Sequence, residues 1–198
     1  MNYLAHTLLS HQSAEAILGA LLGDFVKGPI TAAYPSQVGD AIRLHRLIDR
    51  YTDSHPVVLS SHTLVSGARR RFAPIMVDVF YDHFLARHWN DYCDVSLPRF
   101  AQNIYDVLQT HRAAIPERLQ LLVPSMTAND WFNAYADIAG MQAAINGIAR
   151  RLRRFRRAAV LHGGADELVQ NYAAFERDFR LFFPDLRNYV FHCQRRVA

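Results

Sequence analysis

Apolar residues recur at helical spacing along almost the whole chain, and this periodicity constrains the fold more than any other feature. No run of six residues alternates between apolar and polar side chains with the period of two that a half-buried strand shows. The chain has 198 residues, a length that suits one domain with a sizeable core. We therefore predict an all-α fold, with residues 1–198 forming a single compact helical domain.

Prolines, glycines and capping residues divide the periodic pattern into segments. Ser13 suits an N-cap and Gly28 suits a helix stop. Pro74 and Pro98 suit first helical turns, where the N–H that proline lacks has no partner in any case. The predicted helices run from Ser13 to about Lys27, from just after Ser36 to near Asp53, over 57–71, from Pro74, from Pro98, over 129–157 with a break near Gly140, and over 165–183 until Pro184.

Charge and cysteine content narrow the class of protein. The formal net charge is +4 with histidines neutral, which is compatible with an acidic partner. Cys93 and Cys193 form no CxxC pair, so they exclude a disulfide framework and a zinc ribbon and favour a reducing compartment. The stretch MNYLAHTLLSH lacks the basic region of a signal peptide, and the apolar run AILGALLG is far too short to span a membrane. We predict a cytoplasmic protein with no membrane span.

The segment RLHRLIDRYTDSH, residues 43–55, carries ligand-type side chains on a face that a helix normally buries. His45, Asp49 and Asp53 lie four residues apart, so they share one side of the predicted helix. The same side carries Ala41 and Ile42, which belong to the apolar stripe. These polar groups need partners, because an unpaired buried carboxylate costs several kcal/mol.

The helix predicted over PIMVDVFYDHFLARHW repeats this pattern. Asp78 and Asp82 share its apolar stripe, and His83 lies beside Asp82 at the edge of the stripe. Asp24 follows the apolar side of the first predicted helix, and His6 lies among apolar residues. A divalent cation would neutralise several of these carboxylates at once, and mixed imidazole and carboxylate ligands suit Mn, Fe, Zn or Mg. The spacing leaves a second interpretation open, in which the same residues form buried ion pairs and hydrogen bonds without a metal.

Four motifs in the first ninety residues resemble one known family. They are MNYLAH, GDFVKG, HRLIDRYTDSHP and RRRFAPIMVDVFYDHFLARHW, in that order. The family is that of the bacterial acyl carrier protein phosphodiesterases, also called acyl carrier protein hydrolases. The resemblance continues more loosely to about residue 185, through DWFNAYADIAGMQAAINGIARR and FFPDL.

The resemblance implies an HD-domain-like fold, because this family is all-helical and is grouped with the HD-type metal-dependent phosphohydrolases. It implies cleavage of the phosphodiester between a serine of holo-acyl carrier protein and its 4′-phosphopantetheine arm, giving apo-acyl carrier protein and free 4′-phosphopantetheine. Mn²⁺ is the favoured metal, with Mg²⁺ or Fe²⁺ as alternatives. The family's motif residues are, in this sequence, His6, Asp24, His45, Asp49, Asp53, Asp78, Asp82 and His83.

The chain contains no His-Asp dipeptide, the dyad for which the HD superfamily is named, so we choose ligands by helical face and spacing. The predicted metal ligands are Asp24, His45, Asp49, Asp82 and His83. We predict catalytic roles for His6 or Asp78, as general acid or base, and for Arg46, as a bidentate partner of phosphate oxygens. Arg46 fits equally well as a solvated helix arginine.

The segment ARRLRRFRRAAV carries six arginines within residues 150–157. We predict that it docks the acidic carrier protein, because opposite charge steers association. The residues chosen for this role are Arg150, Arg151, Arg154 and Arg157. A solvated charged face is the alternative, and the lack of an RNA-type aromatic motif argues against nucleic acid. The aromatic residues of NDWFNAYADIAGM, 129–141, suit core packing or a wall for the pantetheine arm.

Two other functions stay open on the sequence alone. An HD-type phosphohydrolase of a small nucleotide would use the same metal site and need no protein-docking surface. A non-catalytic helical module would bind an acidic protein through the arginine-rich segment and need no metal. The three hypotheses therefore differ in metal dependence and in the use of that segment.

Overall fold

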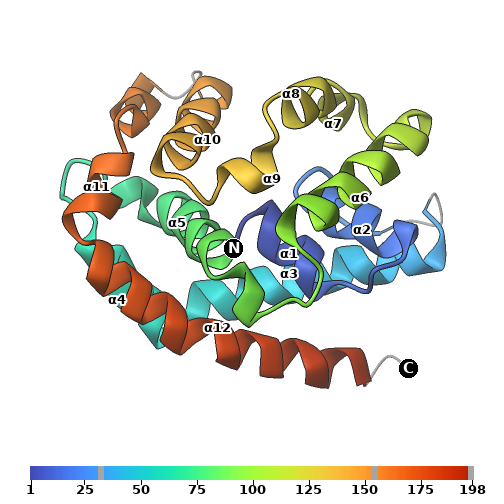
Figure 1. Ribbon diagram of the computed structural model, residues 1–198, viewed down its shortest axis with the longest axis horizontal. Helices are drawn as coiled ribbons and strands as arrows, with labels where there is room; N and C mark the ends of the chain where they lie inside the picture. The colour runs from blue at the N-terminus through green and yellow to red at the C-terminus, as the bar shows by residue number, and fades with distance from the viewer. Residues whose placement is uncertain (31–33, 153–155, 196–198) are drawn as a thin grey trace.

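The computed structural model describes residues 1–30, 34–152 and 156–195, and every regular element in these ranges is a helix (Figure 1). The all-α prediction is therefore confirmed. The α-helices are α1 (Tyr3–Leu9), α2 (Ala14–Leu22), α3 (Ser36–Ser54), α4 (Pro56–Leu64), α5 (Ala73–Arg87), α6 (Leu97–Thr110), α7 (Glu117–Gln120), α8 (Val123–Ala128), α9 (Trp131–Ala134), α10 (Ile138–Arg151), α11 (Ala165–Gln170) and α12 (Tyr172–Arg195). The short 3-10 helices are η1 (Arg70–Phe72), η2 (Trp89–Asp91), η3 (Arg112–Ala114) and η4 (Arg156–Leu161). Within these same ranges, no helix has the length and apolar character that crossing a membrane requires.

The helices α1 and α5 lie near the middle of the molecule, with α4 and α12 along one side and the short helices α7 to α9 on the other (Figure 1). The core between α5 and α12 is aromatic. Phe80 meets Phe175 edge-to-face with ring centroids 5.1 Å apart, and both rings are fully buried. Such pairs stabilise the fold beyond the apolar area that they remove from water. Because α5 is central, even its polar residues Asp82 and His83 are buried.

The helices α2 and α3 pack so closely that no side chain fits at Gly19. A Cβ atom at Gly19 of α2 would lie 2.5 Å from the Val38 carbonyl oxygen and 2.5 Å from the Ala41 Cβ of α3. Glycine at this position therefore permits the contact, which holds the polar stripe of α3 against the N-terminal part of the chain.

The ends of two early helices differ from the prediction. Ser13 caps α2 as expected, since its hydroxyl accepts from the Ala16 N–H at 3.2 Å. The helix ends at Leu22 rather than near Lys27, because a turn follows in which the Phe25 N–H donates back to the Leu22 carbonyl at 2.9 Å. The helix predicted over 57–71 stops at Leu64, and a turn separates it from η1. The spacing of apolar residues does not predict these local hydrogen bonds, so it does not predict where the helices end.

The prediction that Pro184 ends a helix is wrong. α12 runs through Pro184 to Arg195, because its buried stripe continues past the proline with Leu186 and Val190. Pro184 is exposed, so the carbonyl that loses its helical partner can bond to water instead. The predicted break near Gly140 is displaced as well, since α10 begins at Ile138 and contains Gly140.

Candidate metal centre

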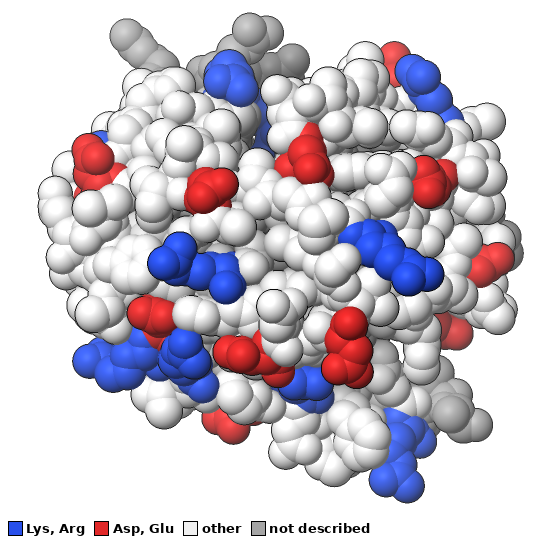
Figure 2. Space-filling model, in the orientation of Figure 1, with Lys and Arg blue, Asp and Glu red and all other residues white. Residues whose placement is uncertain are grey.

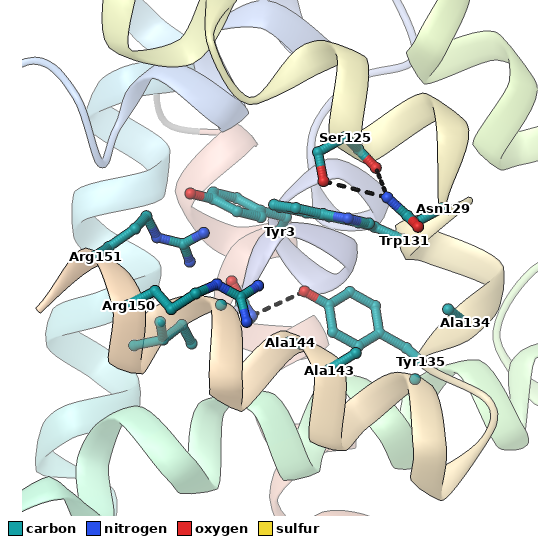
Figure 3. A pocket seen from close by; sticks show the side chains of 14 residues that line it. Tyr3, Ser125, Asn129, Trp131, Ala134, Tyr135, Ala143, Ala144, Arg150 and Arg151 are labelled. Atoms are coloured by element: carbon teal, nitrogen blue, oxygen red, sulfur yellow. Dashed lines mark hydrogen bonds between the residues drawn. The ribbon is translucent and has the colours of Figure 1, made fainter. Parts of the chain in front are cut away.

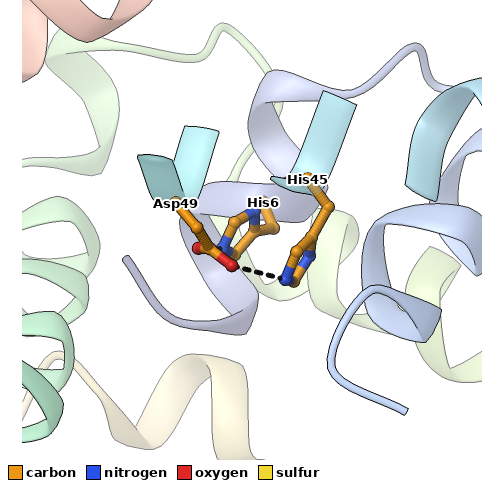
Figure 4. A group of neighbouring side chains, drawn as sticks. All are labelled: His6, His45 and Asp49. Atoms are coloured by element: carbon orange, nitrogen blue, oxygen red, sulfur yellow. Dashed lines mark ion pairs between the residues drawn. The ribbon is translucent and has the colours of Figure 1, made fainter. Parts of the chain in front are cut away.

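His6 of α1 and His45 and Asp49 of α3 form one cluster, although α1 and α3 are far apart in the sequence (Figure 4). Their ligand-type atoms all lie within 4.8 Å of one another. The two carboxylate oxygens of Asp49 divide between the histidines, with Oδ1 3.1 Å from His6 Nε2 and Oδ2 3.2 Å from His45 Nε2. One carboxylate therefore faces two imidazoles at once.

The two imidazoles are stacked and almost completely buried. Their ring centroids lie 3.6 Å apart at an interplanar angle of 12°, and each residue is 2% exposed. His45 Nδ1 lies 2.6 Å from the Ala20 carbonyl oxygen, to which it can only donate, so in the neutral ring Nε2 keeps its lone pair on the side of Asp49. His6 Nδ1 is buried and has no hydrogen-bond partner among the described residues. The donor set of two imidazoles and one carboxylate fits a borderline divalent cation such as Mn, Fe or Zn.

The centre reaches solvent through its carboxylates. The side chain of Asp49 is 41% exposed and lines an open groove together with Arg46, Arg50 and Asp53. Asp24, on the turn after α2, lies 3.7 Å from His45 Nε2 and is 49% exposed. Asp24 therefore offers a further oxygen ligand at the open side of the cluster.

The electrostatics of the cluster link its members. Burial works against charge on His45, but the contacts with Asp24 and Asp49 outweigh it and raise its pKa to about 9. Burial and the neighbouring His45 lower the pKa of His6 to about 4. Against the effect of burial, the two histidines hold the pKa of Asp49 far below its ordinary range. One imidazole is thus protonated and the other neutral at pH 7 when no metal is bound.

Gly23 makes room for the imidazole of His45. A Cβ atom at this position would lie 2.1 Å from His45 Cγ, closer than any real side chain allows. Residue 23 opens the motif GDFVKG that carries the family resemblance, but the helical pattern assigns it no role. Its spacing of four residues from Gly19, on the face of α2 that meets α3, is a second signal in the sequence.

A second polar cluster surrounds the first turn of α1 and uses the acidic residues of α5. Asp82 is fully buried and accepts from three backbone N–H groups, those of Leu4 at 2.8 Å and of Asn2 and Ala5 at 3.3 Å each. It therefore caps α1 from a different helix. Asp78 accepts from the Met1 amino group at 2.6 Å. Burial raises the pKa of Asp82 to about 7 against the lowering effect of these donors.

Comparison with known proteins shows which family the chain belongs to. A family model described as acyl carrier protein phosphodiesterase matches residues 1–186. The chain belongs to the acyl carrier protein phosphodiesterase family. A relative of that name from Photorhabdus laumondii is 35% identical over 198 residues, which cover 98% of each chain. One from Yersinia pestis is 34% identical over 195 residues, covering 98% of this chain and 100% of the relative. No solved structure matches this chain.

Six of the eight residues that the resemblance to this phosphodiesterase family singled out divide between the two clusters. His6, His45 and Asp49 lie in the candidate metal centre, with Asp24 at its edge, and Asp78 and Asp82 belong to the second cluster. Asp53 lines the groove beside Asp49. The structure does not bring the predicted ligands Asp82 and His83 to the candidate metal centre. His83 instead lies 2.8 Å from the Tyr135 carbonyl oxygen and 3.0 Å from the Tyr172 hydroxyl.

Arg46, predicted to act in catalysis, and the arginines predicted to dock the carrier protein take different positions. Arg46 lines the groove beside Asp49 and donates to the Val26 carbonyl at 2.8 Å, which fixes its guanidinium near the centre. Arg150 and Arg151 line a separate cavity (Figure 3). Arg154 and the side chain of Arg157 lie outside the described residues. The face in Figure 2 shows basic and acidic side chains interspersed, with no field of one sign over its described part.

Proposed function

We propose that this chain is a metal-dependent phosphodiesterase that releases 4′-phosphopantetheine from a serine of holo-acyl carrier protein. Membership of the family supports the substrate. One structural observation carries the rest of the proposal, namely the carboxylate of Asp49 shared between two stacked, buried imidazoles. We further assign the chain to the HD-type enzymes, with His45 and Asp49, one helical turn apart, in place of a contiguous pair.

A bound cation would balance the charges and lone pairs of the three cluster residues better than their contacts with one another do. Two imidazoles stacked at 3.6 Å cannot both be protonated without strong repulsion, and burial together with this repulsion lowers the pKa of His6. A divalent cation in place of the proton on His45 would satisfy both rings and the carboxylate. We propose His6, His45 and Asp49 as protein ligands, with Asp24 as a fourth, and Mn²⁺ as the metal, with Mg²⁺ or Fe²⁺ as alternatives.

The chemistry is an in-line displacement at phosphorus. When bound, the cation supplies Lewis-acid stabilisation of charge on the phosphoryl oxygens. The oxygen of a water molecule bonds to phosphorus, the bond from phosphorus to the serine oxygen breaks, and the serine oxygen takes up a proton. Asp24 is half-exposed beside the cluster, so the carboxylate oxygen that the cation leaves free could accept the proton of the attacking water and pass it to the serine oxygen. Arg46 is placed to pair with the phosphate oxygens from the groove.

Three residues with predicted roles, Asp78, Asp82 and His83, are left out of this mechanism because each is held by other groups. Asp78 is held by the Met1 amino group, so it does not serve as general acid or base in the proposal. Asp82 accepts three backbone N–H groups, which occupy most of its lone pairs, so it is not proposed as a ligand. His6 moves from a proposed acid or base to a proposed ligand.

Mass spectrometry of the carrier protein tests the proposal. Purified enzyme is incubated with holo-acyl carrier protein and Mn²⁺, with and without a chelator. Conversion to the apo form that stops with chelator and returns with Mn²⁺ is the expected result. Turnover of small nucleotides without conversion of the carrier would favour the nucleotide hydrolase. Chelator-insensitive binding of the carrier without turnover would favour the non-catalytic module.

A further inference from the structure

A cavity of about 180 Å³ lies between α8, α9 and α10 and is closed at the back by the start of α1 (Figure 3). Figure 3 shows the guanidinium groups of Arg150 and Arg151 at one side of it and the rings of Trp131 and Tyr135 at the other. Small side chains of α10, Ala143 and Ala144 among them, form its floor. None of these residues takes part in the metal centre.

The cavity and the metal centre share α1 as a wall. Asn2 and Tyr3 line the cavity, and His6 of the metal centre lies one turn after Tyr3. Asn2 Nδ2 donates to the Tyr135 hydroxyl at 3.0 Å, which ties α1 to the cavity wall. Burial raises the pKa of the Tyr3 hydroxyl, Asp24 raises it further and Arg151 lowers it, so charges of both sites act on this hydroxyl. The two sites are therefore neighbours along α1.

The lining has the chemistry of a site for a slim chain with carbonyl groups. Arginine side chains offer only donors, which suits amide oxygens as well as anions. Arg151 lies over the Trp131 ring, with its Cζ 5.9 Å from the ring centroid, so its guanidinium is held in place at the rim. The aromatic rings and alanines then leave an apolar slot for methylene groups. Apart from the two arginines, few residues of the lining could pair with a charged head group deep in the cavity.

We propose that this cavity binds a segment of the substrate's prosthetic arm, a chain of alkyl and amide groups, while the phosphate at the end of that arm lies at the metal centre. The inference rests on the proposed function, because the arm belongs to the proposed substrate. A cavity of roughly 150 Å³ holds a benzene molecule. A volume of about 180 Å³ therefore takes one amide-bearing segment and not the whole arm.

Gly147 of α10 provides the means to close the cavity without damage to the fold. A Cβ atom there would meet only the guanidinium nitrogens of Arg150 and Arg151, each at 3.8 Å. Gly147→Leu therefore extends into the cavity beside both arginines, and Gly147→Ala leaves it open. Both changes remove a glycine from a helix interior, so both variants are expected to have a higher Tm than the wild type.

Calorimetry with pantetheine, which has the arm but no phosphate, measures binding directly in the metal-free protein. We expect wild type and Gly147→Ala to bind it equally and Gly147→Leu to bind it at least about tenfold more weakly. Equal binding by both variants, or no binding by wild type, overturns the proposal. Inorganic phosphate is the second probe. If phosphate binds, loses affinity in Gly147→Leu and pantetheine does not bind, the cavity is an anion site and the proposal is wrong.

Kinetics separate this inference from the proposed function. With holo-acyl carrier protein, Gly147→Leu is expected to raise KM, whereas hydrolysis of bis(4-nitrophenyl) phosphate, a phosphodiester without the arm, should match that of Gly147→Ala. A parallel loss with both substrates would mean that the variant disturbs the metal centre and would contradict an arm-binding role. Pantetheine binding that depends on residue 147, in an enzyme that leaves holo-carrier protein intact, would overturn the proposed function and support the arm site.

Discussion

The helix α1 contributes to two polar clusters, the proposed metal centre around Asp49 and the cap formed by Asp82, and the two use carboxylates in opposite ways. Asp82 is fully buried and accepts three fixed backbone N–H groups. Asp49 is 41% exposed and faces two imidazoles that repel each other when both are protonated. A carboxylate whose lone pairs accept from backbone donors stabilises the fold. A carboxylate that lies between two competing imidazoles is suited to bind a cation.

The largest expected effect tests the Asp49 side of this comparison. Asp49→Ala should lower kcat/KM on holo-acyl carrier protein by about 10³-fold or more, because even changes behind a metal ligand cost 10- to 100-fold. Metal binding should weaken in parallel, and the free energy of unfolding of the metal-free protein at pH 7 should fall as well, because the buried His45 loses one of the carboxylates that hold its proton. Asp40→Ala, on the same helix and paired only with Arg43, is the control. Activity above a tenth of wild type in Asp49→Ala would remove Asp49 from the proposed ligands.

Asp82→Ala should act mainly on stability. Three buried N–H groups would lose their acceptor, which is expected to lower the free energy of unfolding by about 3 kcal/mol. Urea denaturation of the metal-free protein measures this loss. Asp82→Asn retains one acceptor oxygen and should lose less than the alanine variant. A loss below about 1 kcal/mol in Asp82→Ala would mean that the cap contributes little.

Gly23→Ala tests the packing that positions His45. The new Cβ would lie 2.1 Å from His45 Cγ, so the imidazole must move away from Asp49. We expect kcat/KM and Mn²⁺ affinity to fall by about 10- to 100-fold. Gly67→Ala, where an added Cβ meets nothing within 4 Å, is the matched control. If both alanine variants retain full activity, the position of His45 is not critical.

The pH dependence of metal binding tests the protonation of His45, with an expected effect of about tenfold per pH unit. The folded-state pKa of His45, raised to about 9, lies above its ordinary value of about 6.5. Its contribution to the stability of the metal-free protein is therefore fully present below pH 6.5 and is lost as the pH rises through 9. The pKa of His6, lowered to about 4, has the opposite sign, so its contribution is present above pH 6.5 and is lost as the pH falls through 4.

Mn²⁺ must displace the proton of His45, so its affinity should rise by about tenfold per pH unit between pH 7 and 9. Calorimetry at pH 7.5 in buffers of different ionisation enthalpy should show release of about one proton per Mn²⁺ bound. Asp82, at the other cluster, should not affect this number. An affinity independent of pH over this range would contradict the proposal that His45 is a ligand.

Much of the fold was predictable because helical periodicity is a local property. The helix from Ser36 to Ser54 and the shared face of His45 and Asp49 follow directly from the spacing of residues. Pro184 misled the prediction, because the burial of the α12 stripe outweighs one lost backbone hydrogen bond. The spacing of apolar residues in α12 predicts that one face is buried, but it does not show which helices cover that face.

The sequence by itself determined that the chain is helical and that it buries imidazoles and carboxylates on two helical faces. Only the tertiary structure decided which of them meet. His6 joined His45 and Asp49 because α1 packs against α2 and α2 packs against α3, while Asp82 points at the backbone of the first turn of α1. The physical reason is that the spacing of residues along one helix fixes only the direction in which each side chain leaves that helix. A ligand set needs side chains from separate helices. How closely those helices approach each other depends on packing at positions such as Gly19 and Gly23.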